Sequence, residues 1–76
     1  MDWDIEIDAA DLKCPLPVLR LQKRLREVEP GTVVRLLATD PMAAIDVPHF
    51  CAEAGHTYLG TDDTANVPAF LVRKGV

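Results

Sequence analysis

The sequence predicts an α/β fold, a two-layer sandwich in which two helices cover one face of a mixed four-stranded sheet, in the order β-α-β-α-β-β. Three observations support this prediction. Apolar and acidic residues alternate near the N-terminus, two later stretches have helical periodicity, and two β-rich stretches near the C-terminus flank a turn. Strand–helix units with short links favour parallel strands joined by right-handed crossovers, and a closing hairpin adds an antiparallel strand. At 76 residues, the chain is expected to form one domain, residues 1–76.

The first strand and the first helix differ in the period of their apolar residues. Trp3, Ile5 and Ile7 alternate with acidic residues over residues 3–8, which is typical of a strand with one buried face. Residues 15–28 change to helical spacing, and their core-facing stripe is formed by Val18, Leu21, Leu25 and Val28. The sequence EPG at residues 29–31 should end this helix.

The middle of the chain should hold an interior strand and a second helix. Residues 32–39 are almost continuously apolar, as expected for a strand covered by helices. Asp40 is suited to cap the helix that follows, Pro41 to its first position, and Gly55 to its end. Pro48 predicts a kink or a fresh helical start, which Asp46 would cap. The core-facing residues of this segment are expected to be Ile45, Phe50 and Ala54.

The C-terminal third should form an antiparallel hairpin. Residues 57–61 and 67–74 are rich in strand-forming residues and flank the turn-rich sequence DDTAN. Pro68 has no backbone N–H, so it belongs at a strand start, a bulge or an edge. His56 is expected to mark the beginning of the hairpin rather than to act in catalysis.

The composition argues against several classes of function. Hydrophobic residues make up 49% of the chain and charged residues 26%, which suffices for a core. A formal net charge of −4 and few aromatic residues argue against direct nucleic-acid binding. The acidic N-terminus is unlike a signal peptide, and no apolar run is long enough to span a bilayer. We therefore expect a cytoplasmic protein without membrane contact.

The two cysteines, Cys14 and Cys51, should be reduced in the cytoplasm and are too few for a disulfide scaffold. His49 and Cys51 are two residues apart and would diverge on a helix, so the spacings match no metal site. We expect neither a metal nor a cofactor. Cys51 lies in an apolar stretch, which favours a buried core residue over a resolving thiol that pairs with Cys14.

Cys14 directly precedes the predicted helix start in the sequence DLKCPLP. A residue before proline is disfavoured in the α region, so Cys14 should be the N-cap and Pro15 the first helical residue. Pro15 and Pro17 stiffen the first turn and remove two donors, which leaves the Leu16 N–H as the main donor to the sulfur. The helix N-terminus and the neighbouring Lys13 should lower the pKa of the thiol. The sequence therefore predicts an exposed, nucleophilic sulfur.

Nothing in the sequence brings His49 or His56 to Cys14 as a general base. Acyl transfer by a cysteine requires such a base. A thiolate without a base or a substrate pocket suits sulfur-to-sulfur exchange, and transfer of sulfane sulfur as a persulfide fits that chemistry.

Together with the order of elements, these motifs resemble the TusA/SirA-like sulfur carriers over essentially the whole chain. The strongest match is CPLP at residues 14–17, similar to the family's Cys-Pro-x-Pro motif at the start of the first helix. TDP at 39–41, DVPHF at 46–50 and AGH at 54–56 resemble family positions around the second helix. One departure is Asp11, because the family commonly has a glycine two or three residues before the cysteine. Its charge should raise the pKa of the thiol somewhat.

The resemblance implies that Cys14 accepts sulfur as a persulfide from a cysteine desulfurase or a rhodanese-like donor and passes it to a downstream acceptor protein. Such a protein is a sulfurtransferase-type carrier used stoichiometrically, and Lys13, Pro15, Leu16 and Pro17 would position its sulfur. The resemblance also implies the two-layer sandwich with a mixed four-stranded sheet. It leaves the pathway open among tRNA thiolation, molybdenum-cofactor sulfuration, sulfur oxidation and selenium handling.

A basic strip on the first helix is formed by Arg20, Lys23 and Arg24. We expect it either to dock an acidic partner or to be an ordinary solvated helix face. The alternative function is a non-catalytic regulatory or RNA-interaction module on the same fold, in which Cys14 would be dispensable. A thiol redox enzyme would need a resolving cysteine, and Cys51 is the only candidate.

Overall fold

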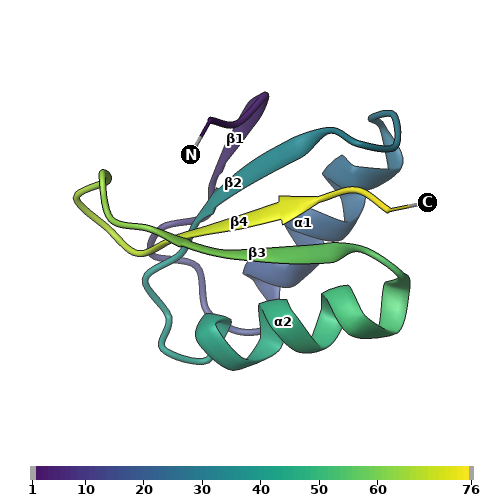
Figure 1. Ribbon diagram of the computed structural model, residues 1–76. Coiled ribbons are helices and arrows are strands. Elements are labelled where there is room, and N and C mark those ends of the chain that lie inside the picture. Colours follow the sequence, from purple (N-terminus) through teal and green to yellow (C-terminus); the bar gives the residue numbers. More distant parts are fainter. Residues whose placement is uncertain (1, 76) are drawn as a thin grey trace.

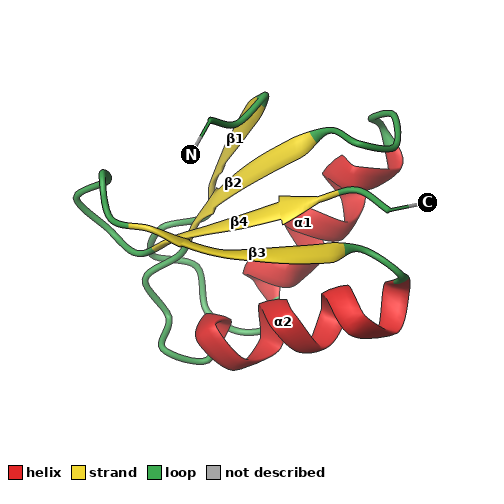
Figure 2. Ribbon diagram, in the orientation of Figure 1, coloured by secondary structure: helices red, strands yellow, loops and turns green. Residues whose placement is uncertain are grey.

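The computed structural model describes residues 2–75. The elements follow in the order β1 (Ile5–Asp8), α1 (Leu16–Arg26), β2 (Val33–Leu37), α2 (Ala43–Ala54), β3 (Thr57–Asp62) and β4 (Ala69–Arg73). The sheet order is β1-β2-β4-β3, with β1 parallel to β2 and β4 antiparallel to β2 and β3. Both helices lie on the same side of the sheet (Figure 1, Figure 2). The predicted two-layer α/β sandwich is confirmed.

The core lies between the helices and the sheet. From α1 it receives Leu21 and Leu25, which are at most 1% exposed, while Val18 and Val28 pack at its margin. The predicted stripe of the first helix is therefore confirmed. Each fully buried leucine side chain contributes about 1.5–3 kcal/mol relative to an exposed one, so this stripe fixes α1 and the turn that precedes it.

The core-facing side of α2 differs from the prediction. Ala43, Val47 and Cys51 are buried, whereas Ile45 is 64% exposed. The helix is continuous through Pro48 with no fresh start, so the i, i+4 series that begins at Ala43 sets its buried face and places Ile45 on the opposite side. The other two predicted core residues, Phe50 and Ala54, are partly buried, and Phe50 packs against the core.

Both helices begin later than predicted. Pro15 rather than Cys14 is the N-cap of α1, and Met42 rather than Asp40 is the N-cap of α2. Asp40 instead closes the turn before α2, where its Oδ1 accepts the Met42 N–H at 2.9 Å. Asp46 caps nothing, because its own N–H donates to the Met42 carbonyl inside the helix at 2.8 Å. Gly55 ends α2 with a φ of 84°, in the left-handed region that glycine favours.

The C-terminal hairpin is confirmed. β3 pairs with β4 antiparallel, with a register shift between Tyr58 and Gly60. Pro68 directly precedes β4, and its carbonyl accepts the Ala38 N–H at 3.0 Å. His56 directly precedes β3, as expected.

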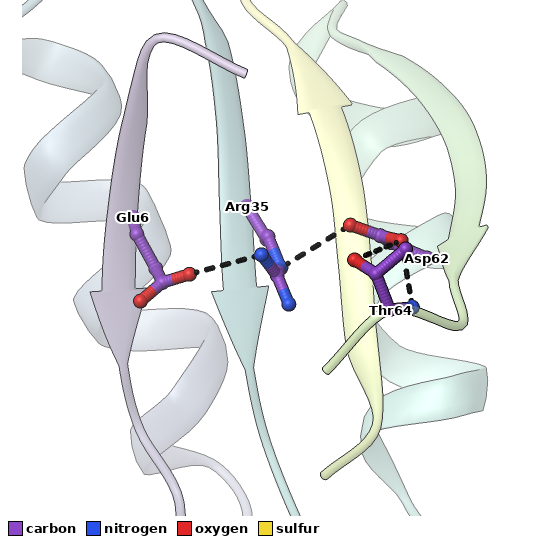
Figure 3. A network of polar contacts seen from close by, with 4 residues as sticks. All are labelled: Glu6, Arg35, Asp62 and Thr64. Atoms are coloured by element: carbon purple, nitrogen blue, oxygen red, sulfur yellow. Dashed lines mark hydrogen bonds and ion pairs between the residues drawn. The ribbon is translucent and has the colours of Figure 1, made fainter. Parts of the chain in front are cut away.

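The sheet face away from the helices carries an ion network around the buried side chain of Arg35, shown in Figure 3. Arg35 of β2 is 6% exposed and lies 3.3 Å from Glu6 of β1 and 3.4 Å from Asp62 of β3. The Trp3 ring stacks on the Arg35 guanidinium at 4.1 Å. Trp3 was expected beside Ile5 and Ile7, and this was wrong. β1 starts only at Ile5, so the strand alternation does not extend to Trp3.

Candidate functional site

Cys14 lies in the connection between β1 and α1, two residues before the helix, and its side chain is exposed. Its backbone N–H donates to Asp40 Oδ2 at 2.6 Å. Asp40 follows β2, the strand parallel to β1. Residues that follow parallel strands meet at one edge of a sheet, the usual place for functional groups in α/β folds. The topology thus brings Cys14 and Asp40 together.

The Cys14 side chain contacts a different carboxylate from the one that binds its backbone. Its thiol donates to Asp46 Oδ2 at an Sγ–Oδ2 distance of 3.0 Å. Asp46 lies on the first turn of α2 and is partly buried. Sequence reasoning considered Asp46 only as a helix cap and missed this contact. The available signal was its place on the first turn of α2, shortly after Asp40 in the sequence.

The pKa of the Cys14 thiol shifts in the direction opposite to the one expected. The hydrogen bond to Asp46 raises the pKa of Cys14, and partial desolvation and the charges of Asp46 and Asp40 raise this pKa further. The Leu16 N–H donates to the Lys13 carbonyl at 2.8 Å and closes the turn instead of serving the sulfur. The charge of Lys13 affects Asp40 rather than the thiol. The pKa of Asp40 is lowered mainly by the N–H groups of Cys14 and Met42 and less by the lysine charge.

Asp11 occupies a backbone position that glycine favours. Its φ is 69°, in the left-handed region, which aspartate visits more readily than most residues. Its N–H donates to Thr39 Oγ1 at 2.9 Å and fixes the loop before Cys14 to the end of β2. This conformation explains why a glycine suits the position. The acidic groups that raise the pKa of the thiol are Asp46 and Asp40 rather than Asp11.

Two spaces adjoin Cys14, one too small to hold a water molecule and the other an open groove. No water-sized atom fits in the space between Cys14, the first turn of α1 and α2. Beside it, a groove of about 330 Å³ is lined by Cys14, Pro15, Val18, Asp46, His49, Phe50 and Glu53. His49 therefore lies on the same groove as the thiol, which the sequence did not predict. Its Nε2 is 2.9 Å from Glu53 Oε1.

His56 lies in a different cavity, of about 210 Å³, with Arg26 and Lys74 among the residues that line it. Its Nδ1 accepts the Gly75 N–H at 3.1 Å. Burial and, to a smaller extent, Lys74 lower the pKa of His56. The cavity that holds His56 has no wall in common with the two spaces around Cys14 apart from Phe50.

The basic side chains of α1 gather on another surface. Arg20, Lys23 and Arg24 line a shallow concavity of about 430 Å³ with Ile7 and Glu27. Arg24 Nη1 lies 3.4 Å from Glu27 Oε1, so part of its charge is offset. The three predicted docking residues are thus neighbours, on a surface that does not include Cys14.

Cys51 is 1% exposed, and burial raises its pKa to about 11. The expected burial of this cysteine is confirmed, and both cysteines are free thiols. Within residues 2–75, no three histidine, cysteine or acidic side chains lie together as a metal site would require. In the same range, none of the helices has the length and apolarity to cross a bilayer.

Comparison with known proteins decides the family. The family model described as "Sulfurtransferase TusA" matches residues 5–74. The chain belongs to the TusA family. The Sulfur carrier protein TusA of Pseudomonas entomophila is 41% identical over 93% of this chain and 89% of that protein. That of Pseudomonas aeruginosa is 35% identical over 93% and 90%.

A solved structure agrees with this assignment. The crystal structure of the SirA-like protein from Desulfitobacterium hafniense matches with a TM-score of 0.75 and 27% identity, over 92% of this chain and 95% of that one. The likeness that CPLP indicated at residues 14–17 therefore extends through the fold of this TusA-family chain.

Proposed function

We propose that this protein is a sulfur carrier in which Cys14 accepts sulfane sulfur as a persulfide and passes it to another protein. The observation that carries the proposal is the placement of Cys14. Its thiol is exposed on a stiff turn. The space between this turn and α2 is too small for a water molecule, and an open groove lies beside the thiol. The surroundings of this sulfur do not enclose a small substrate, yet the sulfur is accessible to a persulfide presented by another protein. The family membership and the names of the Pseudomonas relatives support the same role.

The proposed loading step is a sulfur-to-sulfur exchange. The Cys14 sulfur attacks the outer sulfur of a donor persulfide, and a new S–S bond forms as the donor's S–S bond breaks. The electron pair leaves on the donor sulfur, which takes up the proton that Cys14 releases. Thiol and persulfide exchange places without net oxidation. Unloading repeats the step with an acceptor thiol as the attacking group, so one Cys14 carries one sulfur per cycle.

We propose a cysteine desulfurase or a rhodanese-like protein as the donor and a downstream protein as the acceptor. The concavity lined by Arg20, Lys23 and Arg24 supports docking of an acidic partner. Lys13 and Leu16 close the turn before α1, and Pro15 and Pro17 stiffen it, so these four residues position the sulfur.

The cytoplasm is the proposed location, because its reducing conditions keep an exposed thiol such as Cys14 free. We further propose that residues 1–76 act as one domain, since both helices and the sheet share one hydrophobic core.

Intact-protein mass spectrometry tests the proposal. After incubation with a cysteine desulfurase and cysteine, the wild-type protein should gain the mass of one sulfur, and a thiol reductant should remove it. Cys14→Ser should gain nothing, whereas the matched variant Cys51→Ala should load like the wild type. Absence of the gain with an active desulfurase would overturn the proposal. Full function of Cys14→Ala in cells, with loss of function in Arg20→Glu, would favour the regulatory module instead.

A further inference from the structure

Asp46 holds the Cys14 sulfur through a contact that only an unloaded thiol makes. The thiol is the donor, and Sγ lies 3.0 Å from Asp46 Oδ2. The backbone of Cys14 is fixed separately, because its N–H donates to Asp40 Oδ2. The side chain is therefore free to leave Asp46 while the backbone of the turn stays in place.

A second sulfur on Cys14 removes this contact. In a persulfide, Sγ bonds to Cβ and to the outer sulfur and carries no hydrogen, so it no longer donates to Asp46. The outer sulfur lies about 2 Å beyond Sγ. No water-sized atom fits beneath Cys14, so the outer sulfur has to extend into the open groove or into solvent. A hydropersulfide is more acidic than a thiol, and its anion is repelled by the Asp46 carboxylate.

We propose that Asp46 is a positioning residue that retains the unloaded thiol against α2 and turns the loaded persulfide outward toward a partner. This inference rests on the persulfide chemistry proposed for Cys14. The proton that the Asp46 contact holds on Sγ is the one that ends on the donor sulfur when the donor's S–S bond breaks, so the exchange stays balanced. Loading thereby converts a docked neutral thiol into an outward-facing hydropersulfide, and the outer sulfur then loses its own proton to solvent to give the anion.

The other charged groups around Cys14 are engaged elsewhere. Asp40 accepts the backbone N–H groups of Cys14 and Met42, and the charge of Lys13 contributes to the lowered pKa of Asp40. On α2, His49 and Glu53 pair with each other along the groove. Within residues 2–75, Asp46 supplies the side-chain hydrogen bond to the sulfur.

The test begins with the unloaded protein. Alkylation of Cys14 by iodoacetamide is measured by peptide mass spectrometry from about pH 6 to about pH 10, which brackets the titration of a thiol. Asp46→Asn removes the charge and should shift the rate profile to lower pH, with a severalfold faster reaction at neutral pH. Asp46→Glu keeps the charge and should lie closer to the wild-type profile. Glu29→Gln, which loses a carboxylate beyond the far end of α1, should match the wild type. Thermal melting verifies that each variant is folded.

The second measurement uses the same proteins loaded with inorganic polysulfide, a chemical donor that needs no partner protein. The wild-type persulfide should alkylate faster than the thiol, and this ratio should fall severalfold in Asp46→Asn because only the thiol gains reactivity. A profile of Asp46→Asn that coincides with the wild type overturns the inference, and so does equal acceleration of thiol and persulfide. Failure of a desulfurase to load Cys14 would count against the proposed function alone.

Discussion

Cys14 and Cys51 are the two thiols of the chain, and the pKa of each is raised for a different physical reason. Cys14 is exposed, and a hydrogen bond to Asp46 holds its proton. Cys51 is buried beside Val47 on the core face of α2, where the lack of water disfavours the thiolate. The first shift decreases when one contact breaks, because the hydrogen bond to Asp46 is its largest cause, whereas the second disappears only when the core opens. The pKa of both thiols is raised, and access to the sulfur separates them.

The largest expected effect is the difference in their labelling rates. Cys51 reacts only after the core opens, so a thiol reagent should modify it at least about a thousandfold more slowly than Cys14, which corresponds to an opening free energy of about 4 kcal/mol. Mass spectrometry in native buffer should show one fast label, and both thiols should react quickly in concentrated urea. Two equally fast labels in native buffer would refute the burial of Cys51.

A core substitution should reduce the difference in labelling rate by accelerating Cys51 without changing Cys14. Leu21 is fully buried, so Leu21→Ala should lower the free energy of unfolding by about 2–5 kcal/mol, as measured by urea denaturation. Labelling of Cys51 should then accelerate by at least about 30-fold, since 1.4 kcal/mol corresponds to a factor of ten, while Cys14 keeps its rate.

Leu19, which is 49% exposed on the same helix, provides the matched control. Leu19→Ala should change the free energy of unfolding by no more than about 0.5 kcal/mol. A comparable loss of stability in both variants would contradict the assignment of the core face of α1.

Alkaline pH should destabilise the protein through Cys51. Folding raises the pKa of this thiol from 9.0 to about 11, so its contribution to stability is complete below pH 9 and is lost as the pH rises toward 11. The shift corresponds to at most about 2.7 kcal/mol. Urea denaturation at a series of pH values should show a shallower loss of stability in Cys51→Ala than in the wild type. Parallel curves would exclude burial of the thiol as the cause.

The smallest expected effect is a change in the rate at which a protein donor loads Cys14, with no change in the rate at which a small reagent labels it. Arg20→Glu should slow loading by a desulfurase about threefold to tenfold, because charge reversal weakens the steering of an acidic partner. Its iodoacetamide rate at Cys14 should equal that of the wild type. Arg73→Glu, a charge reversal at an exposed position of β4, serves as the matched control. An equal loss in both variants would mean that net charge, not the Arg20 surface, governs loading.

The fold was largely predictable because its signals are periodic. Alternation at Ile5 and Ile7 and helical spacing at Leu21 and Leu25 each follow from one element burying one face. The error at Ile45 arose because Pro48 was interpreted as an interruption. A helix tolerates a proline when the freed carbonyl reaches water, and Ala44, four residues earlier, is exposed.

The site was predictable only in part. Cys14 was singled out by a local motif, but the sign of its pKa shift depends on Asp46, 32 positions later in the chain. Sequence reasoning weighed the helix N-terminus and Lys13, which are local, and had no measure of a contact made through the fold. Asp11 shows the same limitation, since its left-handed conformation is decided by the loop that its N–H holds to Thr39.

Trp3 is the only tryptophan of the chain, and it stacks on Arg35 at the face of the sheet opposite both helices. Its fluorescence therefore reports on the attachment of the N-terminal segment and not on the packing between the layers. Circular dichroism reports on the helices, which lie on the other side of the sheet. A fluorescence transition at lower denaturant than the circular dichroism transition would show that the segment before β1 detaches first, so this one side chain lets the two faces of the sheet be followed separately.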